Sequence, residues 1–91
     1  MNANELLQEV KNYLDITWED PQGDKKLMGI ISMGMAYLQR LTLRALTYEE
    51  GTTERALLFN YCRYERSGAR DDFGNNYRTD IITFTMDEAA K

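Results

Sequence analysis

Residues 24–45 read DKKLMGIISMGMAYLQRLTLRA and carry the longest helical pattern in this chain of 91 residues. The main apolar positions follow one another at intervals of four, three, four, three and four residues, the spacing of one face of an α-helix. They are Leu27, Ile31, Gly34, Leu38, Leu41 and Ala45. Neighbouring apolar residues widen this face to about half of the helix circumference. We therefore expect a central helix that packs on more than one side, with Asp24 as its N-cap.

Shorter helices are predicted on both sides of this central segment. Asn4 can cap a helix of roughly three turns that ends near Leu14. Thr52 or Thr53 can cap a third helix, whose inner stripe is formed by leucine and tyrosine side chains. Trp18 lies in the polar linker that contains Pro21 and Gly23. We expect its ring to fill the gap between the first two helices, and contact with a partner is the alternative.

The last twenty residues carry two competing patterns. Phe73, Tyr77, Ile81 and Phe84 share one face at helical spacing, whereas residues 82–86 alternate apolar side chains with threonines, as a strand does. We expect a helix to Phe84 and a short extended tail after it.

Residues 1–91 are thus predicted to form a single all-α domain, a compact bundle of about four helices with a short extended C-terminal tail. The residues expected in its core are Leu6, Val10, Leu14, Trp18, Leu27, Ile31, Leu38, Leu41, Leu57, Leu58, Tyr61, Phe73, Tyr77 and Ile81.

The outer face of the third predicted helix combines an aromatic side chain with arginines. Arg55, Phe59, Arg63, Arg66 and Arg70 lie within about 80° of one another on a helical wheel. Aromatic and arginine side chains dominate the energetics of protein interfaces, so this face is a predicted interface. The alternative is that another helix covers the ring while the arginines stay solvated.

Met33 falls outside the apolar arc of the central helix. Because exposed methionines adapt to many contact surfaces, we add it to the predicted interface. The alternative is an isolated exposed methionine without a role, which is normal on protein surfaces.

Composition restricts the chemistry of this chain. It has no histidine, so the commonest general base and metal ligand is missing. Cys62 is the only cysteine, which excludes an intrachain disulfide and a cysteine-based zinc site. No glycine-rich phosphate-binding motif is present. We therefore predict no enzyme activity, no cofactor and no metal.

Charge is unevenly distributed along the chain. The 15 acidic and 11 basic residues give a net charge of -4, which disfavours a dedicated nucleic-acid binder. Residues 1–35 carry -3, residues 36–70 carry +2 and residues 71–91 carry -3. The basic middle of one copy can therefore meet an acidic end of the next, and chance is the alternative explanation.

A pattern of apolar and aromatic residues extends over most of the chain from Leu14 onward. Its segments are residues 14–18 (LDITW), 24–27 (DKKL) with 29–31 (GII), Gly34 and Tyr37–Leu38, 56–58 (ALL) with 61–64 (YCRY), 72–73 (DF) with 76–77 (NY), and 81–82 (II) with Phe84. In order and spacing this pattern resembles the phage head–tail connector family, the small adaptor or head-completion proteins. The turn Pro21–Gly23 departs from the family, whose members are more simply acidic there.

The resemblance implies a homo-oligomeric ring beneath the portal of a tailed-phage capsid, which extends the DNA channel. The implied partners are further copies of the chain, the portal protein and a neck stopper or tail-completion protein. DNA is only cargo in the channel, and no membrane is involved. The implied location is the virion neck, after assembly in the host bacterial cytoplasm. The family offers no fixed functional residues to transfer. The alternative is a small helical DNA-binding or regulatory domain that uses the arginine face.

Overall fold

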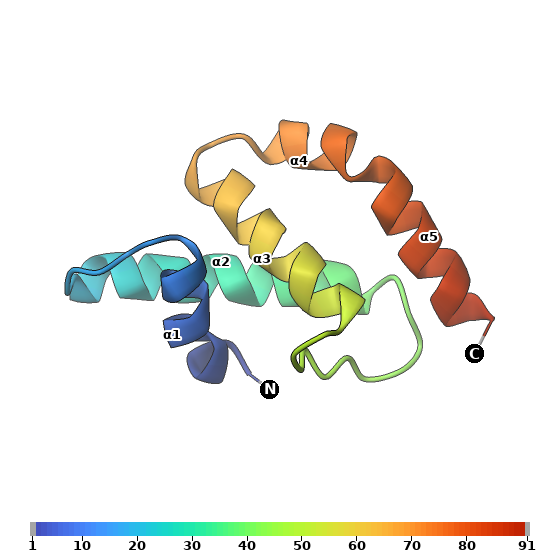
Figure 1. Cartoon of the computed structure of the whole chain (residues 1–91), viewed down its shortest axis with the longest axis horizontal. Helices are drawn as coiled ribbons and strands as arrows, with labels where there is room; N and C mark the ends of the chain where they lie inside the picture. Colours follow the sequence, from blue (N-terminus) through green and yellow to red (C-terminus); the bar gives the residue numbers. More distant parts are fainter. Residues whose placement is uncertain (1, 91) are drawn as a thin grey trace.

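Five α-helices form the structure, a computed structural model that describes residues 2–90. They are α1 (Ala3–Tyr13), α2 (Pro21–Gln39), α3 (Thr53–Arg66), α4 (Arg70–Asn76) and α5 (Arg78–Ala89). No strand occurs among these described residues. The chain is therefore an all-α bundle, with five helices in place of about four. In Figure 1, α3 crosses the long α2, while α1 and α5 lie toward opposite ends of the molecule.

The first two helices begin earlier than predicted. The Asn2 side chain accepts the Glu5 N–H at 2.9 Å, and the Glu5 carboxylate accepts the Asn2 N–H at 3.1 Å, so Asn2 is the N-cap and Asn4 lies inside α1. Asp20 caps α2 by accepting the Gly23 N–H at 3.1 Å. Pro21 suits the first helical position, which needs no N–H donor. The prediction that Asp24 caps this helix was therefore wrong.

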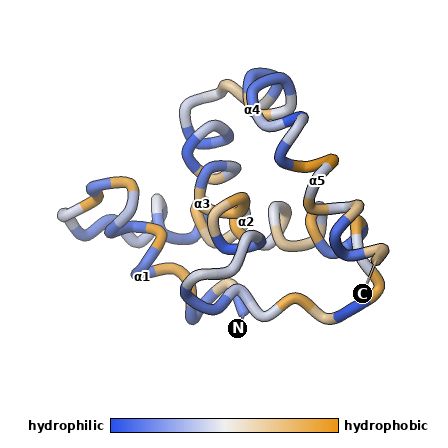
Figure 2. The backbone as a smooth tube through the Cα atoms, turned by 45° about the vertical axis from the view of Figure 1, so that its right-hand side comes forward, coloured by the Kyte–Doolittle hydropathy of each residue, from blue (hydrophilic) through white to orange (hydrophobic). Residues whose placement is uncertain are grey.

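The core lies where α2 crosses α3, and α1, α4 and α5 close its sides. Figure 2 shows hydrophobic residues of α2 and α3 at this crossing. Nine residues that we expected in the core are buried: Leu6, Val10, Leu27, Ile31, Leu38, Leu57, Leu58, Tyr61 and Phe73. Four others are half-buried at its edge: Leu14, Leu41, Tyr77 and Ile81.

Gly34 explains how closely α2 and α3 approach. A Cβ atom at this position would lie 2.7 Å from side-chain atoms of both Leu58 and Tyr61. Real Cβ atoms do not approach other atoms so closely, so only glycine fits here without rearrangement.

Trp18 was wrongly placed in the core. It is 54% exposed on the linker between α1 and α2. The linker is fixed instead at its first residues, where α1 ends in a Schellman motif and Ile16 packs against the core. The gap that Trp18 was expected to fill is bridged by an ion pair between Lys11 and Asp24, whose nearest atoms are 3.0 Å apart.

The helical stripe predicted to reach Ala45 stops at Gln39, where α2 ends. The Gln39 side chain redirects the backbone, since it donates to the Arg44 carbonyl at 2.7 Å and accepts the Leu46 N–H at 3.1 Å. The loop then folds back and buries Leu46 and Tyr48, two core residues that periodicity did not indicate.

The expected extended tail is helical. After a break at Tyr77, α5 continues to Ala89. Phe84 is buried, and the Thr85 hydroxyl donates to the Ile81 carbonyl at 2.9 Å within the helix. Burial on one face therefore outweighs the strand propensity of residues 82–86.

Candidate protein interface

Arg55, the first residue of the predicted arginine face, is held inside the bundle. Its guanidinium lies 2.8 Å from a Glu9 carboxylate oxygen and donates to the Tyr48 carbonyl at 3.1 Å. Its Cζ atom also lies 4.8 Å from the centre of the Phe59 ring. These contacts join α1, the loop before α3 and α3 itself, so Arg55 stabilises the fold.

Phe59 is half-buried, because α1 covers it. The Tyr13 ring lies with its centre 5.5 Å from that of Phe59, tilted by 55°. The Tyr13 hydroxyl donates to the Asn60 side chain at 3.0 Å, which fixes this arrangement. Phe59 is therefore not the exposed anchor of an interface that the helical wheel suggested.

Arg63 and Arg66 remain exposed at the C-terminal end of α3. The Arg63 guanidinium lies 5.1 Å from the centre of the Tyr64 ring, which leaves its charge at the surface. Both arginines line a shallow hollow of about 410 Å³ beside Asp15. Arg70 begins α4, and its side chain lies outside the part that the structure describes. The structure thus separates the predicted face into an inner part and a short basic end.

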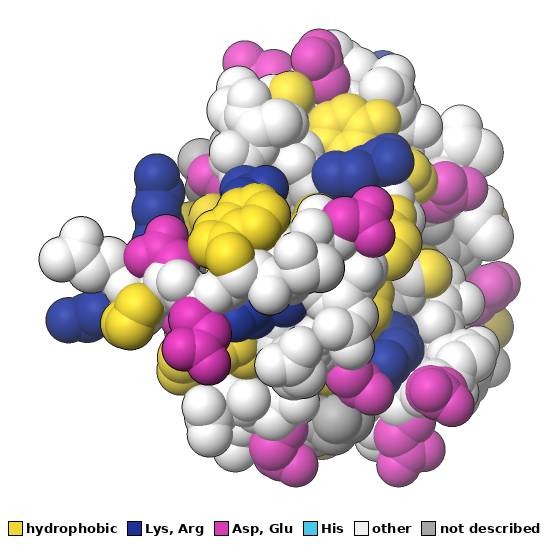
Figure 3. Space-filling model, turned by 60° about the vertical axis from the view of Figure 1, so that its left-hand side comes forward, with side chains coloured by type: hydrophobic (Ala, Val, Ile, Leu, Met, Phe, Trp, Pro, Cys, Tyr) yellow, Lys and Arg dark blue, Asp and Glu magenta, His cyan; other side chains and the backbone are white. Residues whose placement is uncertain are grey.

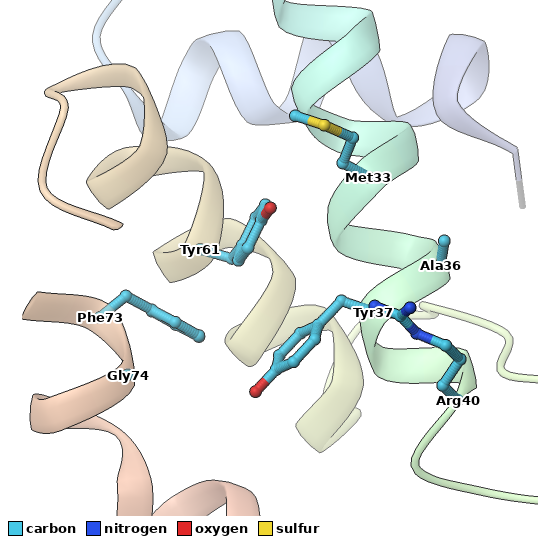
Figure 4. Close-up of a pocket in the computed structure, with 7 residues that line it drawn as sticks. All are labelled: Met33, Ala36, Tyr37, Arg40, Tyr61, Phe73 and Gly74. Carbon is cyan, nitrogen blue, oxygen red and sulfur yellow. The ribbon is translucent and has the colours of Figure 1, made fainter. Parts of the chain in front are cut away.

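Met33 belongs to a different surface, a groove between α2 and α4 with α3 as its floor (Figure 4). We call it the α2–α4 groove, and its volume is about 590 Å³. It is lined by Met33, Ala36, Tyr37 and Arg40 of α2, Tyr61 of α3, and Phe73 and Gly74 of α4.

The floor of the α2–α4 groove is aromatic. The Tyr61 ring stacks on Tyr37 at 6.1 Å and meets Phe73 edge-to-face at 5.5 Å, measured between ring centres. Met33, at the lip, is 45% exposed, and the space in front of Gly74 is open. An apolar concave surface of this kind suits contact with another protein.

Sequence reasoning missed an ion network in which the half-buried Arg44 pairs with two buried carboxylates. Its guanidinium lies 2.6 Å from a Glu88 oxygen of α5 and 3.3 Å from a Glu54 oxygen of α3. The Thr47 N–H also donates to Glu54, and the Thr42 hydroxyl donates to Glu88. The three charged residues stand far apart in the sequence and share no periodicity, so no sequence signal pointed to this network.

Hydrogen bonding sets the ionisation of the network. The hydrogen bonds that the Arg44 guanidinium donates to the Glu88 and Glu54 carboxylates raise the pKa of Arg44 above its ordinary value. Burial by itself would raise the pKa of Glu54, but donors from its own backbone, Arg44 and Thr47 outweigh burial, and the pKa is lowered. Glu54 is therefore held as a carboxylate although it is buried.

Two further buried groups are kept in their neutral forms. Burial, as the larger cause, and the negative charge of Glu54, as the smaller, together raise the pKa of Tyr48 to about 12. In the same way, burial and, to a smaller extent, the negative charge of Glu65 raise the pKa of the Cys62 thiol to about 12. Neither group is poised as a base or nucleophile near neutral pH.

No family model, curated protein or solved structure matches this chain.

Residues 2–90 contain neither a membrane-spanning helix nor a cluster of metal ligands. No helix there is long and apolar enough to cross a membrane. No three acidic or cysteine side chains of that region come together as metal ligands.

On the face drawn in Figure 3, hydrophobic side chains reach the surface among basic and acidic ones. This arrangement is suited to binding another protein.

Proposed function

We propose that this chain is a structural head–tail connector of a tailed phage or prophage. In this role it forms a ring below the portal protein, extends the DNA channel and docks the next neck protein, a stopper or tail-completion factor. It acts in the virion neck after assembly in the bacterial cytoplasm, without catalysis.

The observation that carries this proposal is the pattern of apolar and aromatic residues that resembles the connector family. In the structure, the members of this pattern supply much of the core. The buried ones are Leu27, Ile30, Ile31, Gly34, Leu38, Leu57, Leu58, Tyr61, Cys62, Phe73 and Phe84. The resemblance therefore concerns the residues that determine the bundle, and function is inferred from it by analogy of fold.

Exposed apolar side chains support a role in assembly. Met33, Leu43, Ile82 and Met86 are large and at least 45% exposed. A chain of 91 residues buries only about 60–65% of the surface that it exposes when unfolded, so contacts with neighbours add to a thin core. A net charge of -4 also suits a channel through which DNA must slide, because a basic lumen would retain phosphates.

The proposal is tested with the full chain and the portal protein encoded near its gene. We expect rings in electron micrographs and a matching mass by light scattering, with the portal present or at high protein concentration. A strict monomer that also fails to bind the portal would contradict the proposal.

The DNA-binding alternative is tested by electrophoresis with duplex DNA. Because Arg55 pairs with Glu9, the arginine face offers no continuous basic row to phosphates. We therefore expect no shift even at low salt. A salt-dependent shift at moderate ionic strength would favour the alternative.

A further inference from the structure

Helix α5 is attached to the bundle by few side chains. Of its 12 residues, only Phe84 is buried. Ile81 and Thr85 are half-buried, and the Thr85 hydroxyl donates to the Ile81 carbonyl of the same helix. Among the described helices, α5 packs on α3 and α4 and does not contact α2. Figure 1 shows α5 running from α4 along one side of the molecule. Apolar burial therefore holds α5 mainly through one ring.

The helical path is interrupted at Tyr77, just before α5 begins. This residue has φ -108° and ψ 14°, outside the range of an α-helix. The centre of its ring lies 5.0 Å from that of Phe73 and 5.7 Å from that of Tyr64. Its hydroxyl donates to the Asn60 side chain at 2.9 Å. Tyr77 is therefore anchored to α3 and α4 by contacts that do not involve α5.

The C-terminal end of α5 is held by charge. Arg44 Nε and Nη2 lie 2.6 Å and 2.8 Å from the two carboxylate oxygens of Glu88, so this ion pair is bidentate. The Thr42 hydroxyl donates to the same carboxylate at 3.1 Å. In this contact the Glu88 side chain is only 4% exposed. We call Thr42, Arg44 and Glu88 the clasp.

Release of the clasp leaves no buried charge without a partner. The Glu88 carboxylate moves into water with the end of α5. Arg44 keeps the Glu54 carboxylate of α3, which lies 3.3 Å away, and its own side chain is already partly exposed. Breaking a buried ion pair is costly chiefly when one charge stays buried and unpaired. The clasp can therefore open without disturbing α3 or the central loop.

We infer that α5 is a strap: it opens as a unit from Tyr77 onward while α1–α4 stay folded, and the clasp at its end holds it closed. The open form exposes Phe84 together with the part of the bundle that this ring covers. Elements with few buried contacts open at a lower free energy than the core of a domain. The inference concerns the free chain and does not depend on the proposed function.

Native-state hydrogen exchange of the full chain, measured by NMR for each backbone amide, tests the strap. The amides of residues 82–86 should share one opening equilibrium, with protection factors about 100-fold or more below those of the slowest amides in α2 and α3. Equal protection of α5 and these core amides would show that α5 opens only with the whole chain. A steady gradient of exchange toward Ala89 would show fraying of single turns. Either result would overturn the inference.

A variant of the clasp shows what holds the strap. Glu88→Gln should lower the protection of residues 82–86 about tenfold, because a neutral amide cannot form the bidentate ion pair with Arg44. Asp87→Asn is the matched control, since it removes the same charge from an exposed neighbour and should leave this protection unchanged. If Glu88→Gln has no more effect than Asp87→Asn, the clasp does not hold α5 and the inference fails.

A variant of the core gives the reverse comparison. Ile31 is fully buried on α2, which does not contact α5. Ile31→Val should lower the protection of the slowest α2 and α3 amides several-fold, because it removes one buried methylene group. Since α2 is the same in the open and closed forms, residues 82–86 should keep their wild-type protection. An equal fall in both regions would mean that α5 exchanges through global unfolding, contrary to the inference.

Discussion

Two residues at equivalent positions show how backbone conformation affects stability. α1 and α3 both end in a Schellman motif, in which the residue after the C-cap takes a left-handed conformation. At the end of α3 this residue is Gly68, with φ 77°, but at the end of α1 it is Asp15, with φ 59°. Side chains other than that of glycine are strained in this region, although aspartate tolerates it better than most.

We predict that Asp15→Gly raises the free energy of unfolding by about 0.5–1 kcal/mol, because it relieves this strain. Gly68→Ala should lower it by about 1 kcal/mol, and no clash contributes, since the space around Gly68 is open. Urea denaturation followed by circular dichroism measures both. If both variants have the same free energy of unfolding as the wild type, left-handed strain is not significant at these two positions.

Capping residues show what local sequence can and cannot predict. Thr52 was one of two predicted caps for α3, and its hydroxyl accepts the Arg55 N–H at 3.3 Å. Asp20 was missed because the following Pro21 and Gly23 indicated a linker, although proline is favoured at the first helical position. Tyr48 was missed for another reason: it is buried with φ 60° in a loop, which no periodic pattern describes.

At the scale of the helix, two of the three glycines of α2, Gly29 and Gly34, have opposite surroundings. Gly34 meets α3 side chains at a distance that excludes a Cβ atom, whereas Gly29 has no neighbour within 4 Å of that position. Of these two, only Gly34 is therefore required by the packing of α2 against α3.

We predict that Gly34→Ala destabilises the protein by about 1–3 kcal/mol, because overpacking against Leu58 and Tyr61 exceeds the gain in helix propensity. Gly29→Ala, its matched control, should stabilise by up to about 1 kcal/mol. Thermal and urea unfolding check both values. Stabilisation by Gly34→Ala would mean that α3 moves away from α2 at little cost.

The helical end of α5, which was expected to be an extended tail, could not be predicted from local sequence. Ile82, Phe84 and Met86 alternate with threonines, and this local pattern favours a strand. Tertiary contacts decide otherwise, because Phe84 is buried and Glu88 pairs with Arg44 from a distant loop. A single sequence contains no record of such long-range contacts. The helical wheel likewise could not show that Arg55 and Phe59 of the predicted interface contact residues of α1.

At the scale of the whole molecule, the Arg44 network ties together the central loop, the start of α3 and the end of α5. Glu54 is only 2% exposed, whereas the Arg44 side chain is 37% exposed. Solvent screening at Arg44 therefore places the pair toward the weaker end of buried ion pairs.

We predict that Glu54→Gln lowers the free energy of unfolding by about 2 kcal/mol at neutral pH. The pKa of Glu54 is lower in the folded than in the unfolded chain, so its stabilisation is present above the unfolded pKa of about 4.3 and is lost as pH falls through the folded pKa. The variant should therefore lose less stability on acidification than the wild type. Glu50→Gln, on the exposed loop, is the control and should follow the wild-type pH profile.

The basic end of α3 yields a prediction for assembly. Arg63→Glu combined with Arg66→Glu should block or strongly weaken ring formation, because it reverses the charge of the middle third of the chain. Both side chains are exposed, so circular dichroism should stay unchanged. Light scattering and electron microscopy with the portal protein measure assembly. Normal rings would show that this end of the molecule faces solvent.

The exposed position of Trp18 makes it an optical reporter. It is the only tryptophan in the chain, and its ring is more than half accessible on the linker between α1 and α2. Because water already surrounds much of the indole in the native bundle, its fluorescence should change little when the protein unfolds. Its emission will instead move to shorter wavelength when another molecule covers the linker. Mixing the protein with each candidate partner in a fluorimeter will therefore identify the one that binds at this end of the bundle.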